Sequence, residues 1–197
     1  MKNKNKLFLA LILLFSIMGR AQVADTIFIK KTQSHKVFIE SNKNSEYYKL
    51  FSDFSDFNLS KDSLIVSGKL PSYRWLQVHK FKDKYYLYSP CDLMNDLKYV
   101  FTNNIQIKSS EISTYKILSL IKKNNEFRIK YQDPNTKKKI VLTITQINKE
   151  EDIYKFITYN GSEKYEKIMI KAKDFKKFNI IVNDCFVNKA KELEFEN

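Results

Sequence analysis

Two cysteines and two histidines are the residues of this sequence best suited to covalent or metal chemistry. In chain order His35, His79, Cys91 and Cys185 are separated by 44, 12 and 94 residues. A Cys2His2 zinc site draws its ligands from short, closely spaced pairs. We therefore expect no metal at these four positions.

The two cysteines can pair with each other, stay as two buried thiols, or act separately. Cys91 would become a nucleophile if His79 served as its base, because the thiolate is the reactive form. No family-specific motif surrounds Cys91. A lone pair of cysteines in an oxidising compartment usually forms a disulfide, and the sequence predicts a Cys91–Cys185 bond.

A dense aromatic segment offers the best candidate for ligand binding. Aromatic rings interleaved with a few polar groups can line a pocket or stack on sugars. The candidate residues are Tyr73, Trp75, Gln77, His79, Tyr86 and Tyr88. The alternative is that these rings belong to the core of a β domain, where aromatic residues are common.

The strand that carries Trp75 has two distinct faces. One face reads Tyr73, Trp75, Gln77, His79 and Phe81, and the other reads Arg74, Leu76, Val78 and Lys80. Because side chains alternate along a strand, we expect only one set to face inward. An inward Trp75 face predicts an apolar site oriented by Gln77 and His79. An inward Leu76 face would leave Trp75 on the surface as an interaction residue.

Glycine is too scarce for several enzyme classes. Only Gly68 and Gly161 follow the N-terminal segment, whereas phosphate loops, dinucleotide turns and the hydrolase nucleophile elbow need several glycines at fixed spacing. The consecutive acids Glu150, Glu151 and Asp152 form a turn, not a carboxylate pair held across a cleft. We expect no cofactor and a non-catalytic protein.

The N-terminus has the three parts of a secretory signal. Lys2, Lys4 and Lys6 precede an apolar stretch over residues 7–18, and Gly19-Arg20-Ala21 supplies small residues for cleavage. The apolar stretch is shorter than the ~20 residues of a membrane span. The sequence predicts cleavage after Ala21, no remaining transmembrane anchor, and a secreted or periplasmic location.

The chain is basic, but its arginine content and the distribution of its lysines do not indicate a nucleic-acid-binding protein. Its net charge is +13, and the signal holds four of the positive residues and no acid, so +9 remains after cleavage. Beyond the signal only Arg74 and Arg128 are arginines, and Arg supplies most bidentate contacts to bases and phosphates. The lysines are spread along the chain, which predicts solvated surface positions.

Short apolar runs separated by turn residues predict one mainly β domain over residues 22–197. The Asn160-Gly161 and Asp133-Pro134-Asn135 turns are the strongest hairpin signals. About ten short strands without long helices between them favour an antiparallel barrel or sandwich. Short helices are expected near residues 46–54 and 185–194. The strands are expected near residues 26–30, 36–40, 63–67, 73–81, 85–89, 99–102, 105–108, 112–121, 126–131, 140–147, 153–159, 165–171 and 180–182.

The outline of an exported chain, a meander of hairpins and a helix near the C-terminus is similar to that of lipocalin-like barrels. Lipocalins usually carry Gly-x-Trp on their first strand. Here Trp75 follows Tyr73-Arg74, and two expected strands precede it. The resemblance therefore concerns architecture alone and assigns no residue a role.

Three functions remain open. The first is a binding protein that holds a small apolar ligand in a barrel or curved sheet. The second is an envelope or extracellular module that recognises a protein or polysaccharide through its outer face. The third is a hydrolase without a recognisable motif. A large internal pocket favours the first, and a filled core with an exposed aromatic patch favours the second. A cleft with converging carboxylates, or Cys91 beside His79, favours the third.

Overall fold

The structure is a computed structural model that describes residues 26–57, 69–91, 97–185 and 191–196. The predicted export signal and the strand expected at residues 63–67 lie outside these ranges. No helix in the described part of the chain has the length and apolar character needed to cross a membrane.

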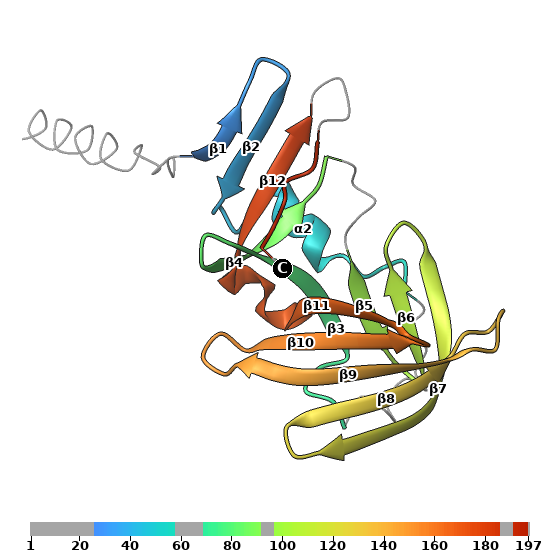
Figure 1. Cartoon of the computed structure of the whole chain (residues 1–197). Coiled ribbons are helices and arrows are strands. Elements are labelled where there is room, and N and C mark those ends of the chain that lie inside the picture. Colours follow the sequence, from blue (N-terminus) through green and yellow to red (C-terminus); the bar gives the residue numbers. More distant parts are fainter. Residues whose placement is uncertain (1–25, 58–68, 92–96, 186–190, 197) are drawn as a thin grey trace, which may run out of the picture.

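The described residues are mainly β, as predicted, with twelve strands in one continuous sheet (Figure 1). The strands are β1 (Ile27–Lys31), β2 (His35–Glu40), β3 (Arg74–Phe81), β4 (Lys84–Ser89), β5 (Lys98–Phe101), β6 (Asn104–Lys108), β7 (Ile112–Lys123), β8 (Glu126–Gln132), β9 (Lys139–Asn148), β10 (Ile153–Asn160), β11 (Glu163–Lys171) and β12 (Asn179–Cys185). Two short helices, α2 (Glu46–Ser52) and η3 (Ala172–Lys177), accompany them.

Eight antiparallel strands close into a barrel. The strands β5 to β11 follow one another as hairpins, and β3 completes the ring by pairing with β11 on one side and β5 on the other. Closure covers part of the open edges that an antiparallel sheet would otherwise expose, since β11 pairs with β3 over residues 168–171. Of the two architectures that the sequence left open, the barrel is present.

The remaining strands form a side sheet above the barrel, in the order β4-β12-β2-β1 (Figure 1). Within it, β4 and β12 form the one parallel pairing among the described strands. Parallel neighbours need a long connection, and here seven of the eight barrel strands, β5 to β11, lie between β4 and β12 in the chain. The two cysteines are bonded beside this pair, with 5.5 Å between the Cα atoms of Cys91 and Cys185. The predicted disulfide is confirmed.

Tight turns set the register of the hairpins. Lys82 and Asp83 both have positive φ (48° and 63°) between β3 and β4, as a two-residue hairpin turn requires. Gly161 has a φ of 64° between β10 and β11, where glycine avoids the steric cost of this conformation. Both turns lie where the sequence predicts them.

The strand β3 is buried on both faces. Trp75 has 0% exposed surface in the barrel interior, while Leu76 and Val78 are 1% exposed on the opposite face. These two pack with Tyr48 and Phe51 of α2 in a second core between the barrel and the side sheet. The expectation that only one face of this strand points inward is wrong, because β3 is shared by two layers.

The helix near residues 46–54 is confirmed as α2. Of the helix expected near 185–194, residues 186–190 lie outside the described ranges, and the described residues at its two ends are not helical. Cys185 ends β12, and residues 191–195 have no regular secondary structure. Leu193 and Phe195 instead pack together against the outer cluster of Val37, Tyr88 and Ile181 on the side sheet. Side chains two positions apart share a face only in an extended chain, and their packing therefore excludes a helix there.

Candidate functional site

The barrel interior is a packed core. Many of its side chains have no more than 1% exposed surface, and these include Trp75, Phe101, Ile129, Leu142, Ile144, Phe156 and Met169. The Trp75 ring lies against Tyr154 and Phe156, with centroids 4.9 and 5.1 Å away, and its indole N–H donates to the Ser72 carbonyl at 3.0 Å. Side chains of this size fill the narrow interior of an eight-stranded barrel.

A groove of about 510 Å³ lies outside this core, where β3 leaves the barrel. The last pair between β3 and β11 is Val78 with Ile168. Beyond it, His79 to Phe81 pair with β4 of the side sheet. The groove is lined by residues 77–80 of β3, residues 166–168 of β11, Lys155 of β10 and residues 195 and 196 of the C-terminal segment. The groove is the fork between two diverging strands.

One wall of the groove exposes a free strand edge. Over residues 163–167, β11 pairs with β10 alone among the described strands. Its other edge carries main-chain N–H and C=O groups without a strand partner there. Because Glu166 and Lys167 line the groove, this edge faces it.

The C-terminal segment closes the opposite side of the fork. The Glu196 N–H donates to the Lys80 carbonyl at 3.2 Å, as one rung of an antiparallel strand pair. The Glu196 carboxylate also forms an ion pair with Lys80 at 3.1 Å and accepts from the Lys82 N–H at 3.0 Å. Part of the β3 edge is thus already covered by strand addition within the molecule.

His79 forms the aromatic floor of the groove together with Phe195. The two rings have centroids 4.4 Å apart, and Tyr88 lies 5.7 Å from His79 and 4.7 Å from Phe195. Burial, together with the positive charge of Lys167, lowers the pKa of the His79 imidazole to about 4. At neutral pH the ring is therefore uncharged, with one N–H donor and one acceptor nitrogen.

The charges around the groove are partly neutralised. Lys155 forms an ion pair with Glu166 at 3.2 Å, and Lys80 with Glu196 as described. Lys167 lines the groove and makes no ion pair with any described residue. The groove therefore offers one cation to a ligand.

A polar network supports the groove from behind. The Asn183 amide donates to Tyr88 at 3.1 Å and to Glu192 at 2.8 Å, and its oxygen contacts His35. Burial raises the pKa of the Tyr88 phenol to about 12, and its hydrogen bond with Glu192 adds to this rise. Tyr88 is therefore neutral, and it anchors the C-terminal segment through the Leu193 N–H at 3.1 Å.

The structure brings together some of the predicted binding residues. Gln77 and His79 line the groove, and Tyr88 contacts His79. Trp75 lies in the barrel core, Tyr73 is 44% exposed elsewhere, and Tyr86 packs against Phe81 in the side-sheet cluster. Sequence reasoning missed Phe195, Lys167 and Glu196, because no local pattern links the chain end to β3 and β11.

The arrangement offers binding groups and no catalytic constellation that we recognise. The disulfide removes Cys91 as a thiol nucleophile. Within the described ranges, no three His, Cys, Asp or Glu residues gather as metal ligands. No protein-family model matches the chain, and comparisons with curated proteins and with solved structures find no significant match.

Proposed function

We propose that this protein is an exported, non-catalytic binding module that recognises an extended segment of a protein partner in the groove between β3, β11 and the C-terminal segment. The observation that carries the proposal is the edge of β11 at residues 163–167, which has no strand partner among the described residues and whose Glu166 and Lys167 line a groove of about 510 Å³. The filled barrel supports an outer binding surface over an internal ligand site.

Strand addition supplies the main-chain part of the recognition. A peptide paired with five residues of β11 would extend over about 17 Å. Affinity in this mode comes from main-chain hydrogen bonds, and specificity comes from pockets for alternate side chains. The rung between Glu196 and Lys80 shows that the neighbouring β3 edge accepts a strand in the same way.

Side-chain selectivity follows from the charges of the edge. Residues 163–167 read Glu-Lys-Tyr-Glu-Lys, and charged side chains on a free edge oppose unspecific pairing. Lys167 favours a carboxylate on the bound segment. Neutral His79 adds a hydrogen-bonding group beside the Phe195 ring.

Selection of random peptides displayed on phage tests the proposal. We expect the purified protein to enrich peptides that carry Asp or Glu within an alternating apolar pattern. The change Lys167→Glu should weaken the binding of these peptides about tenfold or more, because like charges then face each other. The matched control Lys130→Glu changes an exposed lysine on β8, away from the groove, and should leave binding unchanged.

Two outcomes would overturn this function. One is enrichment of peptides that bind the Lys167→Glu and Phe195→Ala variants as tightly as the original protein. The other is binding to arrayed polysaccharides with no peptide enriched, which would identify a carbohydrate partner. Unchanged Trp75 emission in both variants would confirm that the barrel is intact.

The proposed location is secreted or periplasmic. It is supported by the signal pattern of residues 1–21 and by the Cys91–Cys185 bond, since such bonds persist in oxidising compartments. Mass spectrometry of the exported fraction should find Gln22 as the first residue. An intact Met1 recovered from the membrane fraction would contradict export with cleavage.

A further inference from the structure

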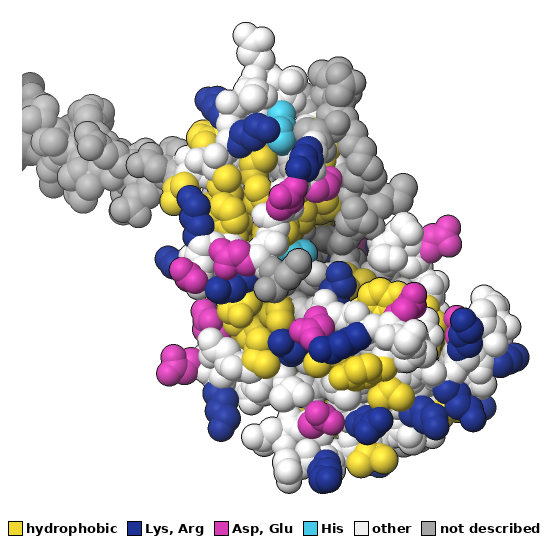
Figure 2. Space-filling model, viewed as in Figure 1, with side chains coloured by type: hydrophobic (Ala, Val, Ile, Leu, Met, Phe, Trp, Pro, Cys, Tyr) yellow, Lys and Arg dark blue, Asp and Glu magenta, His cyan; other side chains and the backbone are white. Residues whose placement is uncertain are grey.

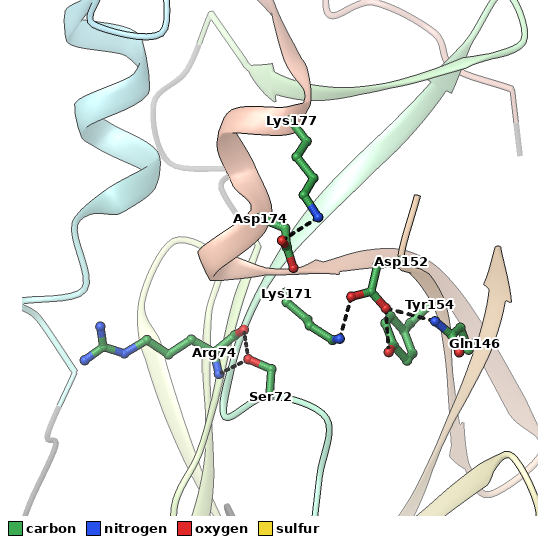
Figure 3. A network of polar contacts seen from close by, with 8 residues as sticks. All are labelled: Ser72, Arg74, Gln146, Asp152, Tyr154, Lys171, Asp174 and Lys177. Atoms are coloured by element: carbon green, nitrogen blue, oxygen red, sulfur yellow. Dashed lines mark hydrogen bonds and ion pairs between the residues drawn. The ribbon is translucent and has the colours of Figure 1, made fainter. Parts of the chain in front are cut away.

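Arg74 is a positively charged residue that does not line the groove. It begins β3 on the outer face of the barrel. Figure 3 shows its side chain extending toward α2, away from the ion pairs Asp152–Lys171 and Asp174–Lys177. The two carboxylates drawn in this view, Asp152 and Asp174, each form an ion pair with a lysine and none with Arg74.

Two aromatic rings hold the Arg74 guanidinium. The group lies over the Phe54 ring at 5.1 Å and over the Tyr73 ring at 5.0 Å from each centroid. Contact with ring faces is favourable for a guanidinium and restricts its rotation. A restricted guanidinium presents its N–H donors in a fixed direction, so little side-chain entropy is lost when an acceptor binds.

The same guanidinium lacks an acceptor. Arg74 forms no ion pair within the described ranges, and its Nε atom is buried without a hydrogen-bond partner. A buried donor of this kind is unfavourable unless something accepts from the group. This feature indicates a ligand that carries the missing acceptor.

A pocket of about 220 Å³ lies beside the guanidinium, between α2, the start of β3 and η3. Its lining contains two cations, Arg74 and Lys173, and no carboxylate. Its aromatic residues are Phe54, Tyr73 and Phe175. The small volume and the excess of positive charge suit a single anionic group on an apolar or aromatic support.

We propose that this pocket is an oxyanion site, in which the Arg74 guanidinium and the Lys173 ammonium bind a carboxylate or phosphate group of a small ligand. The guanidinium matches two oxygens of either group with parallel N–H donors. Lys173 contributes a second positive charge without a fixed direction. The site is separate from the groove and does not depend on the proposed peptide recognition.

Nuclear magnetic resonance of the arginine side chains tests this site directly. The full chain has three arginines, Arg20, Arg74 and Arg128, so the Nε–H region of a ¹⁵N-labelled sample is simple. Single changes to lysine assign each signal. Titrations with inorganic phosphate and with acetate are compared with sodium chloride at equal ionic strength.

We expect the Arg74 signal to shift to a plateau with phosphate, with acetate or with both, while exposed Arg128 on β8 stays in place. Saturation by phosphate alone assigns a phosphate-bearing ligand, and saturation by acetate alone assigns a carboxylate. The change Lys173→Gln should weaken the binding about tenfold through loss of one charge-assisted contact. The control Lys176→Gln removes a nearby η3 lysine that does not line this pocket.

The site would be disproved if the Arg74 signal followed chloride as closely as phosphate and acetate, or if the Arg74 and Arg128 signals moved together. Either result would mean that the added ions only screen the charges of the protein and do not bind at this pocket. The decisive reading uses the unchanged protein, so it does not depend on whether a variant folds.

Discussion

The imidazole of His79 stacks against the ring of Phe195, with centroids 4.4 Å apart, and joins the chain end to β3. Burial lowers the pKa of His79 to about 4, with a further contribution from Lys167. In the unfolded chain the same group titrates near 6.5. The folded protein therefore binds fewer protons than the unfolded chain between these two values.

We predict that stability falls on acidification because of His79. The contribution of neutral His79 to the free energy of unfolding is fully present above pH 6.5. As the pH falls from 6.5 through about 4, this free energy decreases by an amount on the order of 3 kcal/mol. Urea unfolding at several pH values measures it. His79→Gln should flatten the curve in this window, and an unchanged slope in that variant would contradict the assignment to His79.

Trp75 should behave as a core residue. Its emission should be blue-shifted and insensitive to aqueous iodide, because the ring is 0% exposed. Trp75→Ala should lower the free energy of unfolding by about 3–5 kcal/mol, whereas Tyr73→Ala, at a 44% exposed position, should cost much less. Strong iodide quenching in the folded protein would rule out this position for the ring.

Removal of the disulfide should destabilise the protein strongly. The bond closes a loop with a sequence separation of 94, which in the chain-entropy model stabilises by about 4–5 kcal/mol. The double change Cys91→Ser and Cys185→Ser should reduce the unfolding free energy by up to that amount. Labelling of thiols in the unfolded, non-reduced protein should find none, and two labelled cysteines would disprove the bond.

Lys98 holds the C-terminal end of α2 by hydrogen bonds, and we predict that its substitution destabilises the protein. Its ammonium is buried and donates to the carbonyls of Leu50 and Asp53 at 2.8 and 2.9 Å. Lys98→Met leaves both carbonyls without this donor and should cost about 1–3 kcal/mol in urea unfolding. Lys84→Met, at an exposed position on β4, is the matched control. Equal losses in the two variants would show that these hydrogen bonds are unimportant.

Local signals made most of the strands predictable. Asn160-Gly161 and Lys82-Asp83 form turns as expected, because their conformation depends on these few residues. The contacts between distant segments were not predictable in this way. Closure of the ring by Trp75 with Tyr99, and the parallel pair of Ile180 with Leu87, leave no local pattern in the sequence.

The candidate site was predictable only in part for the same reason. Gln77 and His79, which the alternation along β3 places on one face, both line the groove. Phe195 reaches them from the other end of the chain, and the residues around it were expected to be helical. The spacing of Ala190 and Leu193 suits a helix, but packing of Leu193 and Phe195 against the side sheet overrides that local preference.

The position of β5 to β11 between β4 and β12 in the chain has a consequence for the order of assembly. During synthesis, which begins at the N-terminus, β4 is made early. Its parallel neighbour β12 is made only when residues 179–182 follow. Until then residues 86–89 present a bare strand edge rich in apolar side chains, which is prone to aggregate. A nascent chain stopped after Lys171 would contain every barrel strand yet still need a chaperone to protect β4.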